Sequence, residues 1–160
     1  LGVVLMVVVA LGLVMSHAFH VESSVHVDKP AAVVFAHLGS LRTWSGWIGW
    51  DTVGGVEFGG DDGKPGSYAR FPTGTIELVD VQPSAIAYRE KIARPPIDDR
   101  GVIELQPDPP GPNGGASGTT IRWREDGTVD TLFGGWSRLF VARRVQKHVD
   151  DALAQLQTSL

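Results

Sequence analysis

The sequence predicts an α+β domain in which an antiparallel β-sheet packs against one long C-terminal helix. Between Phe19 and Glu125, apolar and polar residues alternate in several short segments, which is the period of a strand with one buried face. After Gly135 the apolar residues recur at spacings of three and four, the period of an amphipathic helix. A length of 160 residues, with 42% hydrophobic and 20% charged residues, suits one folded domain.

The expected elements begin with a strand over residues 19–27, followed by two short helices. Pro30 suits the first turn of a helix, so we expect a helix over residues 31–38 that ends at Gly39. A second short helix is expected over residues 40–47. It carries large apolar residues at a spacing of three: Leu41, Trp44 and Trp47.

Six further strands are expected before the terminal helix, separated by turns rich in glycine and proline. In the third of these strands the apolar face switches from Ile76 and Leu78 to Val79 and Val81, which predicts a β-bulge. Residues 107–115 contain seven Pro or Gly residues among nine and are expected to be irregular. The expected strands cover residues 52–58, 67–71, 75–81, 86–92, 102–105 and 119–125.

The last element is an amphipathic helix that begins near Gly135. Its opposite face is charged, so one side is expected to pack against the sheet while the other faces solvent. The apolar stripe consists of Val145, Val149, Leu153, Leu156 and Leu160.

Residues 1–18 are expected to form a membrane anchor, because residues 1–15 contain no charged or polar side chain. As a helix, residues 1–19 would span roughly 28 Å, close to a hydrocarbon core of roughly 30 Å. A cleaved signal peptide is the alternative, since Ser16-His17-Ala18 fits a small-x-small cleavage site. The folded domain then covers residues 19–160. No Lys/Arg cluster follows the segment, which favours a domain on the non-cytoplasmic side, or a secreted domain after cleavage.

The composition excludes several classes of function. A net charge of −4 argues against an electrostatic nucleic-acid binder, which needs a basic surplus. The absence of cysteine excludes disulfides, thiolate nucleophiles and cysteine-based metal sites. On one strand, His20 and His26 would lie about 20 Å apart, too far to share a metal ion. We find no motif for a cofactor, so neither a metal nor a cofactor is expected.

The stretches at residues 21–38 and 41–51 combine a strand, a proline, a Val-Phe helix and the pattern Leu-x-x-Trp-x-x-Trp. Weaker matches follow at residues 66–71, 74–88 and 118–123. Together they resemble the START-like (SRPBCC) superfamily, and most closely its polyketide cyclase/dehydrase and lipid-transport branch. The resemblance covers almost all of residues 19–160. It implies a helix-grip fold, in which a curved antiparallel sheet wraps around a long C-terminal helix and leaves a cavity between them.

A cavity of this kind would be lined mainly by aromatic and apolar side chains. The alternative for each aromatic residue is packing in the core, and Trp44 is expected to anchor the short helices in this way. The residues that we expect to line the cavity and bind an apolar ligand are Trp47, Tyr68, Phe71, Tyr88, Trp123 and Phe140.

Glu90 and Arg70 are the candidate acid–base residues. Glu90 shares a strand face with Ile86 and Ile92, and Arg70 lies between two apolar residues of the expected strand 67–71. A carboxyl group facing an apolar pocket has a raised pKa and can act as a general acid or base. The alternative is a charge that reaches solvent at a strand end or forms an ion pair across strands.

Three functions remain open at this point. The expected one is the binding of a small hydrophobic ligand, such as a lipid or a polyketide-like molecule, by a membrane-tethered domain, because no catalytic constellation is visible. The second is a polyketide cyclase or aromatase that uses acid–base groups in the cavity and works largely by orienting its substrate. The third is a protein-interaction domain like the Hsp90-activator relatives in the same superfamily.

Overall fold

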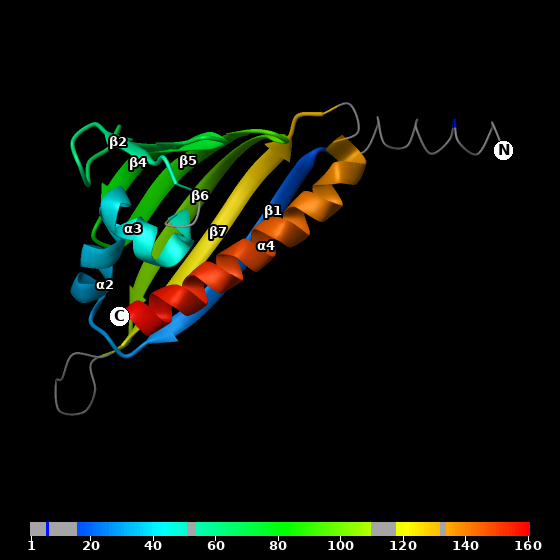
Figure 1. The fold of residues 1–160 in the computed structure, drawn as a ribbon. Helices are drawn as coiled ribbons and strands as arrows, with labels where there is room; N and C mark the ends of the chain where they lie inside the picture. Colours follow the sequence, from blue (N-terminus) through cyan, green and yellow to red (C-terminus); the bar gives the residue numbers. More distant parts are fainter. Residues whose placement is uncertain (1–5, 7–15, 51–53, 110–117, 132–133) are drawn as a thin grey trace.

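A curled antiparallel sheet and one long helix dominate the fold (Figure 1). The computed structural model describes residues 6, 16–50, 54–109, 118–131 and 134–160. Its elements are β1 (Ala18–Val27), α2 (Ala31–Leu38), α3 (Leu41–Ile48), β2 (Glu57–Gly59), β3 (Tyr68–Phe71), β4 (Gly74–Gln82), β5 (Ala85–Ala93), β6 (Pro96–Pro107), β7 (Thr119–Val129) and α4 (Gly134–Ser159).

The sheet has seven strands in the order β1-β7-β6-β5-β4-β3-β2, and all neighbouring pairs are antiparallel. Apart from the crossover that brings β1 beside β7, consecutive strands are neighbours, which is typical of a meander. The helix α4 lies along β1 and β7 on the concave side and also contacts α3 (Figure 1). The expected helix-grip arrangement, with two short helices after the first strand, is therefore confirmed.

The apolar stripe of α4 faces the sheet as expected. Val149 and Leu156 are fully buried, and Leu153 is nearly so. Burial of side chains of this size contributes roughly 1.5–3 kcal/mol each, so the stripe holds the helix firmly against the strands. The bulge predicted in β4 is also present, as a shift of register between Leu78 and Asp80.

The largest difference from the sequence prediction concerns β6, which begins at Pro96 rather than at Val102. The run Asp98-Asp99-Arg100 has low strand propensity and was therefore not predicted as a strand. Pairing with β5 on one side and β7 on the other supplies the backbone hydrogen bonds that outweigh this propensity. As a result, Asp99 lies on the concave face of a central strand.

Two other expectations fall partly outside the described residues. The strand expected over residues 52–58 is shorter, since β2 begins at Glu57, and residues 51–53 are not among those described. Most of the irregular segment predicted at residues 107–115 is likewise not described.

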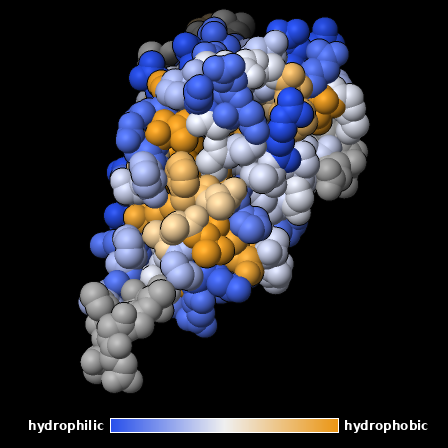
Figure 2. Space-filling view, turned by 90° about the vertical axis from the view of Figure 1, so that its left-hand side faces the viewer, coloured by the Kyte–Doolittle hydropathy of each residue, from blue (hydrophilic) through white to orange (hydrophobic). Residues whose placement is uncertain are grey.

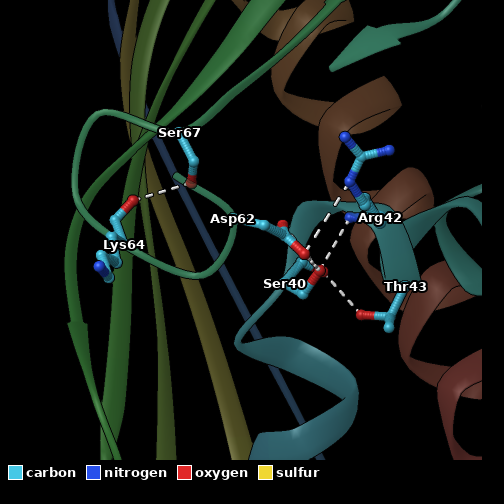
Figure 3. Close-up of polar contacts among 6 residues, drawn as sticks. All are labelled: Ser40, Arg42, Thr43, Asp62, Lys64 and Ser67. Carbon is cyan, nitrogen blue, oxygen red and sulfur yellow. Dashed lines mark hydrogen bonds and ion pairs between the residues drawn. The ribbon is translucent and has the colours of Figure 1, made fainter. Parts of the chain in front are cut away.

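The loop between β2 and β3 is fixed to the start of α3 through Ser40 (Figure 3). The Ser40 hydroxyl accepts a hydrogen bond from the Arg42 backbone N–H (3.2 Å) and donates to the Asp62 carboxylate (2.9 Å to Oδ1). A helix N-cap of this kind is worth about 1 kcal/mol. The contact holds α3 in place, and with it the buried side chains of Trp44 and Trp47.

Figure 2 shows the side of the molecule that carries α2 and α3, where an apolar area is bordered by hydrophilic side chains. The exposed residues of α2 are apolar: Ala32, Val33 and Ala36. Small exposed apolar areas are common on folded proteins.

Within the described part of the chain, no helix is long and apolar enough to cross a membrane. The anchor or signal peptide predicted for residues 1–18 lies almost entirely outside that part and stays a prediction.

Candidate functional site

A cavity of about 650 Å³ lies between the concave face of the sheet, the C-terminal end of α3 and the helix α4. Its apolar wall includes side chains from each of these elements. The aromatic and aliphatic residues of this wall include Trp47, Trp50, Phe71, Ile92, Phe140 and Val141.

Three carboxyl groups from three neighbouring strands line the same cavity. Glu90 on β5 pairs directly with Asp99 on β6, so their side chains lie next to each other on one face. On β7, the residue paired with Asp99 is Gly127. Glu125 is two residues from Gly127, so its side chain lies on the same face as Asp99 and diagonally across from it. Strand pairing therefore brings together three acids that are far apart in the sequence.

A buried chain of hydrogen bonds leads from Trp123 through Tyr88 to Glu125. The Trp123 indole N–H donates to the Tyr88 hydroxyl oxygen over 2.8 Å, and the Tyr88 hydroxyl donates to Glu125 Oε1. Tyr88, Gly101 and Glu125 occupy one row across β5, β6 and β7. Gly101 has no side chain in this row, which lets the Tyr88 ring cross β6 to reach Glu125.

The surroundings of the three acids favour their protonated forms. Burial, followed by the negative charges of Asp99 and Glu125, raises the pKa of Glu90 well above its ordinary value. Burial, with the charges of Glu125 and Asp98, raises the pKa of Asp99 to about 8. Burial also raises the pKa of Glu125, opposed by the hydrogen bond from Tyr88. Like charges this close in a low-dielectric cavity do not all ionise together, so near neutral pH the cluster holds protons that it can donate.

Two buried polar atoms at the cavity wall have no hydrogen-bond partner among the described residues. They are Asp99 Oδ1 and Trp47 Nε1, and both side chains are almost fully buried. An unsatisfied buried polar group costs roughly 1–3 kcal/mol. A bound molecule that supplies a donor to Asp99 and an acceptor to Trp47 would remove this cost.

Two arginines and a histidine also border the cavity, and all three are exposed. Arg94 follows β5, and Arg144 and His148 project from α4 beside Asp151. Within the described residues, no group of three or more His, Asp or Glu side chains is placed to hold a metal ion.

The structure divides the six aromatic residues expected at the cavity into two groups. Trp47, Phe71 and Phe140 line the cavity, Phe140 as an exposed residue of α4. Tyr88 and Trp123 do not line it, because they are packed in the core. Tyr68 does not line it either, because it faces away from the concave side.

Four aromatic residues pack against one another beside the cavity: Trp44, Trp47, Tyr88 and Trp123. The ring centroids of Trp44 lie 5.3 Å from those of Trp47 and Tyr88, and the Trp123 ring lies 5.7 Å from Trp47. Trp44 also donates from its indole nitrogen to the Leu38 carbonyl, 2.8 Å away, which joins α2 to α3 as expected for an anchor. The cavity begins where this cluster ends.

The two candidate acid–base residues lie on opposite faces of the sheet. Glu90 lines the cavity, as the strand period predicted. Arg70 is exposed on the outer face, where its guanidinium carbon lies 5.5 Å from the Tyr68 ring centroid. The alternation of β3 explains this, since Ala69 is the buried residue of that strand and Arg70 follows it.

Sequence reasoning missed Asp99 and Glu125. Glu125 follows Ile121 and Trp123 at intervals of two in a strand that was predicted, so its inward direction could have been inferred. No such signal marks Asp99, because its polar neighbours Asp98 and Arg100 break the alternation that predicts a strand.

A family model described as polyketide cyclase/dehydrase and lipid transport matches residues 18–160. The Zhui aromatase/cyclase from Streptomyces sp. R1128 has a similar structure, with a TM-score of 0.69 and 18% identity over 89% of this chain and 93% of that chain. A search of the curated proteins found no match.

Two further solved structures are similar in the same way. The di-domain ARO/CYC BexL from the BE-7585A biosynthetic pathway gives a TM-score of 0.68 and 15% identity over 94% of this chain and 52% of that chain. A protein from Nitrosospira multiformis gives a TM-score of 0.66 and 16% identity over 88% of this chain and 94% of that chain. At these identities, the likenesses show a shared fold.

Proposed function

This chain belongs to the polyketide cyclase/dehydrase and lipid transport family, and we propose that its cavity binds a small molecule with an apolar body. The cavity carries the proposal. Its volume of about 650 Å³ falls within the range of roughly 300–1,000 Å³ typical of small-molecule sites. Its wall combines aromatic and aliphatic side chains with a few polar groups, which is also typical of such sites.

Filling the cavity is expected to weaken ligand binding strongly. Val145 lines the cavity from α4, so Val145→Trp places an indole in the space that a ligand would occupy. We expect Nile red, a neutral apolar dye, to gain fluorescence with the wild-type protein and to bind this variant about tenfold or more weakly. The matched control is Val79→Trp, because Val79 is 56% exposed on β4 and does not border the cavity. Equal affinity of both variants for the dye would contradict the proposal.

The carboxyl cluster favours a second candidate function, acid–base catalysis of the cyclase or dehydratase type. An aldol cyclisation removes a proton from a carbon beside one carbonyl and delivers a proton to the oxygen of another. Glu90 and Asp99 are adjacent at the cavity wall, and their raised pKa values suit this exchange near neutral pH. Arg70 lies outside the cavity, and we propose no chemical role for it there.

Glu90→Gln separates the two functions. If the cavity catalyses cyclisation, this variant should reduce turnover of a linear poly-β-ketone thioester by about a hundredfold or more while its affinity for the thioester stays unchanged. Glu77→Gln, at an exposed position of β4, is the control and should retain wild-type turnover. No turnover by the wild-type protein, together with tight Nile red binding, would leave binding as the function.

We also propose that residues 1–18 tether the domain to a membrane. In support, β1 begins at Ala18, whose carbonyl accepts a hydrogen bond from Arg138 at the start of α4 (3.4 Å). The next residues of α4, Leu139 and Phe140, are exposed, and Phe140 also borders the cavity. A tether at Ala18 would therefore hold the cavity near the bilayer.

The mass of the mature protein distinguishes the tether from its alternative. An uncleaved chain in the membrane fraction of the host is the expected result for an anchor. A soluble chain that begins at Phe19 would contradict it and would establish a cleaved signal peptide.

A further inference from the structure

The carboxyl cluster of Glu90, Asp99 and Glu125 has no described partner of opposite charge. Within the described residues, no Lys, Arg or His forms an ion pair with Glu90, Asp99 or Glu125. Asp99 is 2% exposed, and its Oδ1 has no hydrogen-bond partner in the part of the chain that the structure describes. Buried carboxyl groups are normally paired or hydrogen-bonded, so the cavity presents an acceptor that nothing in the described chain satisfies.

The cluster differs from an ordinary acidic surface in its position. Surface carboxylates are hydrated and bind cations weakly. Here the three carboxyl groups line one cavity together with Trp47 and Trp50. An ammonium group gains both from charge-assisted hydrogen bonds to carboxylates and from the face of an indole ring.

The remaining wall restricts what can carry the ammonium group. Phe71, Ile92 and Val141 give the cavity an apolar lining large enough for an alkyl or aromatic body. The exposed guanidinium groups of Arg94 and Arg144 lie in solvent at the border, where they attract an anion only weakly. Together these features favour a ligand with a cationic end directed inward and an apolar body.

We propose that the cavity selects cationic amphiphiles, in which a primary amine on an apolar chain donates hydrogen bonds to Asp99 and lies beside Glu90 and Glu125. This inference rests on the proposed binding function and names its ligand class. A primary ammonium group has three donors, enough to contact all three carboxyl groups. Binding then converts carboxylic acids to carboxylates that pair with the ammonium group, and the displaced protons pass to the buffer.

Three probes with the same tail and different charges test the proposal. Dodecylamine, dodecanol and dodecanoate are each titrated against the protein loaded with Nile red, near neutral pH and below their micelle concentrations. We expect dodecylamine to displace the dye at a concentration about tenfold or more below that of dodecanol. We expect dodecanoate to be the weakest, because a carboxylate has no hydrogen to donate to Asp99 Oδ1. Calorimetry in two buffers of different ionisation enthalpy should show proton release with dodecylamine alone.

Two variants assign the selectivity to the cluster. Asp99→Asn and Glu125→Gln should each weaken dodecylamine binding by about tenfold and change dodecanol binding by less than about twofold. Asp98→Asn is the matched control, because Asp98 lies on the outer face of β6 in an ion pair with Arg89. Circular dichroism verifies that each variant is folded.

The outcomes separate this inference from the function on which it rests. Equal binding of the three probes, or a preference for dodecanoate, overturns the charge selectivity and leaves the binding function intact. A dodecylamine preference that survives in both cluster variants also overturns it. If neither Nile red nor any of the probes binds, the binding function fails, and the inference fails with it.

Discussion

Replacing Gly101 by alanine is expected to lower the free energy of unfolding by about 3 kcal/mol. A β-carbon at this position would overlap the ring and hydroxyl of Tyr88, which cross β6 at Gly101. The Tyr88 ring cannot move aside easily, because Trp44 and Trp123 pack against it. The hydrogen bond from Tyr88 to Glu125 would therefore be lost together with the packing. Urea denaturation followed by tryptophan fluorescence measures the change.

Gly46→Ala is the matched control, with an expected effect of opposite sign. Gly46 lies in α3, and a β-carbon there would have no atom within 4 Å. Alanine in a helix is more stable than glycine by about 1 kcal/mol, so this variant should unfold at a higher urea concentration.

A double variant tests the cause. In a Tyr88→Ala background, Gly101→Ala should cost little, since the ring that it would overlap is absent. If the full cost persists in that background, strain at Gly101 does not come from Tyr88, and our account of this row of the sheet is wrong.

The fold could be predicted because its signals are local and repeated. The alternation in β1, β5 and β7 and the stripe on α4 each extend over several residues, and single exceptions do not obscure them. The same alternation placed Glu90 on the buried face of β5 correctly. The bulge in β4 was also visible, as a switch of the apolar face at Leu78 and Val79.

The carboxyl cluster could not be predicted, because it is made by pairing between strands. Asp99 faces Glu90 only through the register of β5 with β6, and register is not encoded in either strand alone. The polar residues beside Asp99 also concealed the first half of β6. A functional site that breaks the local pattern of its own strand is expected to escape sequence reasoning.

The aromatic residues show a related limit. Tyr88 and Trp123 have the same local pattern as cavity-lining residues, and both do face the concave side. Whether such a residue meets the cavity or the core depends on how far the short helices reach over the sheet. Trp44 and Trp47 cover that part of the sheet, and this long-range contact leaves no local signal.

Asp99→Asn is expected to change how the stability of the ligand-free protein depends on pH. Between about pH 4, its ordinary pKa, and the raised value of about 8, the folded state keeps a proton on Asp99 that the unfolded state has lost. Folding then binds protons, so this contribution to stability is complete below about pH 4 and is lost as the pH rises towards about 8. The asparagine amide of the variant does not ionise, so the variant does not lose this stability as the pH rises.

The difference in unfolding free energy between Asp99→Asn and the wild type should therefore grow in favour of the variant, by about 3 kcal/mol between about pH 5 and pH 8. Urea titrations of both proteins at several pH values measure it. The lowered pKa of His148 acts with the opposite sign in this range, but it is common to both proteins and cancels in the difference. Glu90 and Glu125 add a fall in stability with pH to both proteins.

Asp98→Asn is the control for this pH profile, because the pKa of Asp98 is lowered whereas that of its neighbour Asp99 is raised. The hydrogen bond from Arg89 lowers the pKa of Asp98, and the pair is about half exposed. The variant should lose less than about 1 kcal/mol. It should keep most of the wild-type slope between about pH 5 and pH 8, because Asp98 is ionised throughout and contributes less than burial and Glu125 to the raised pKa of Asp99. If Asp99→Asn also kept the wild-type slope, Asp99 would be ionised in the folded protein. The carboxyl cluster would then hold fewer protons near neutral pH than acid–base chemistry in the cavity requires.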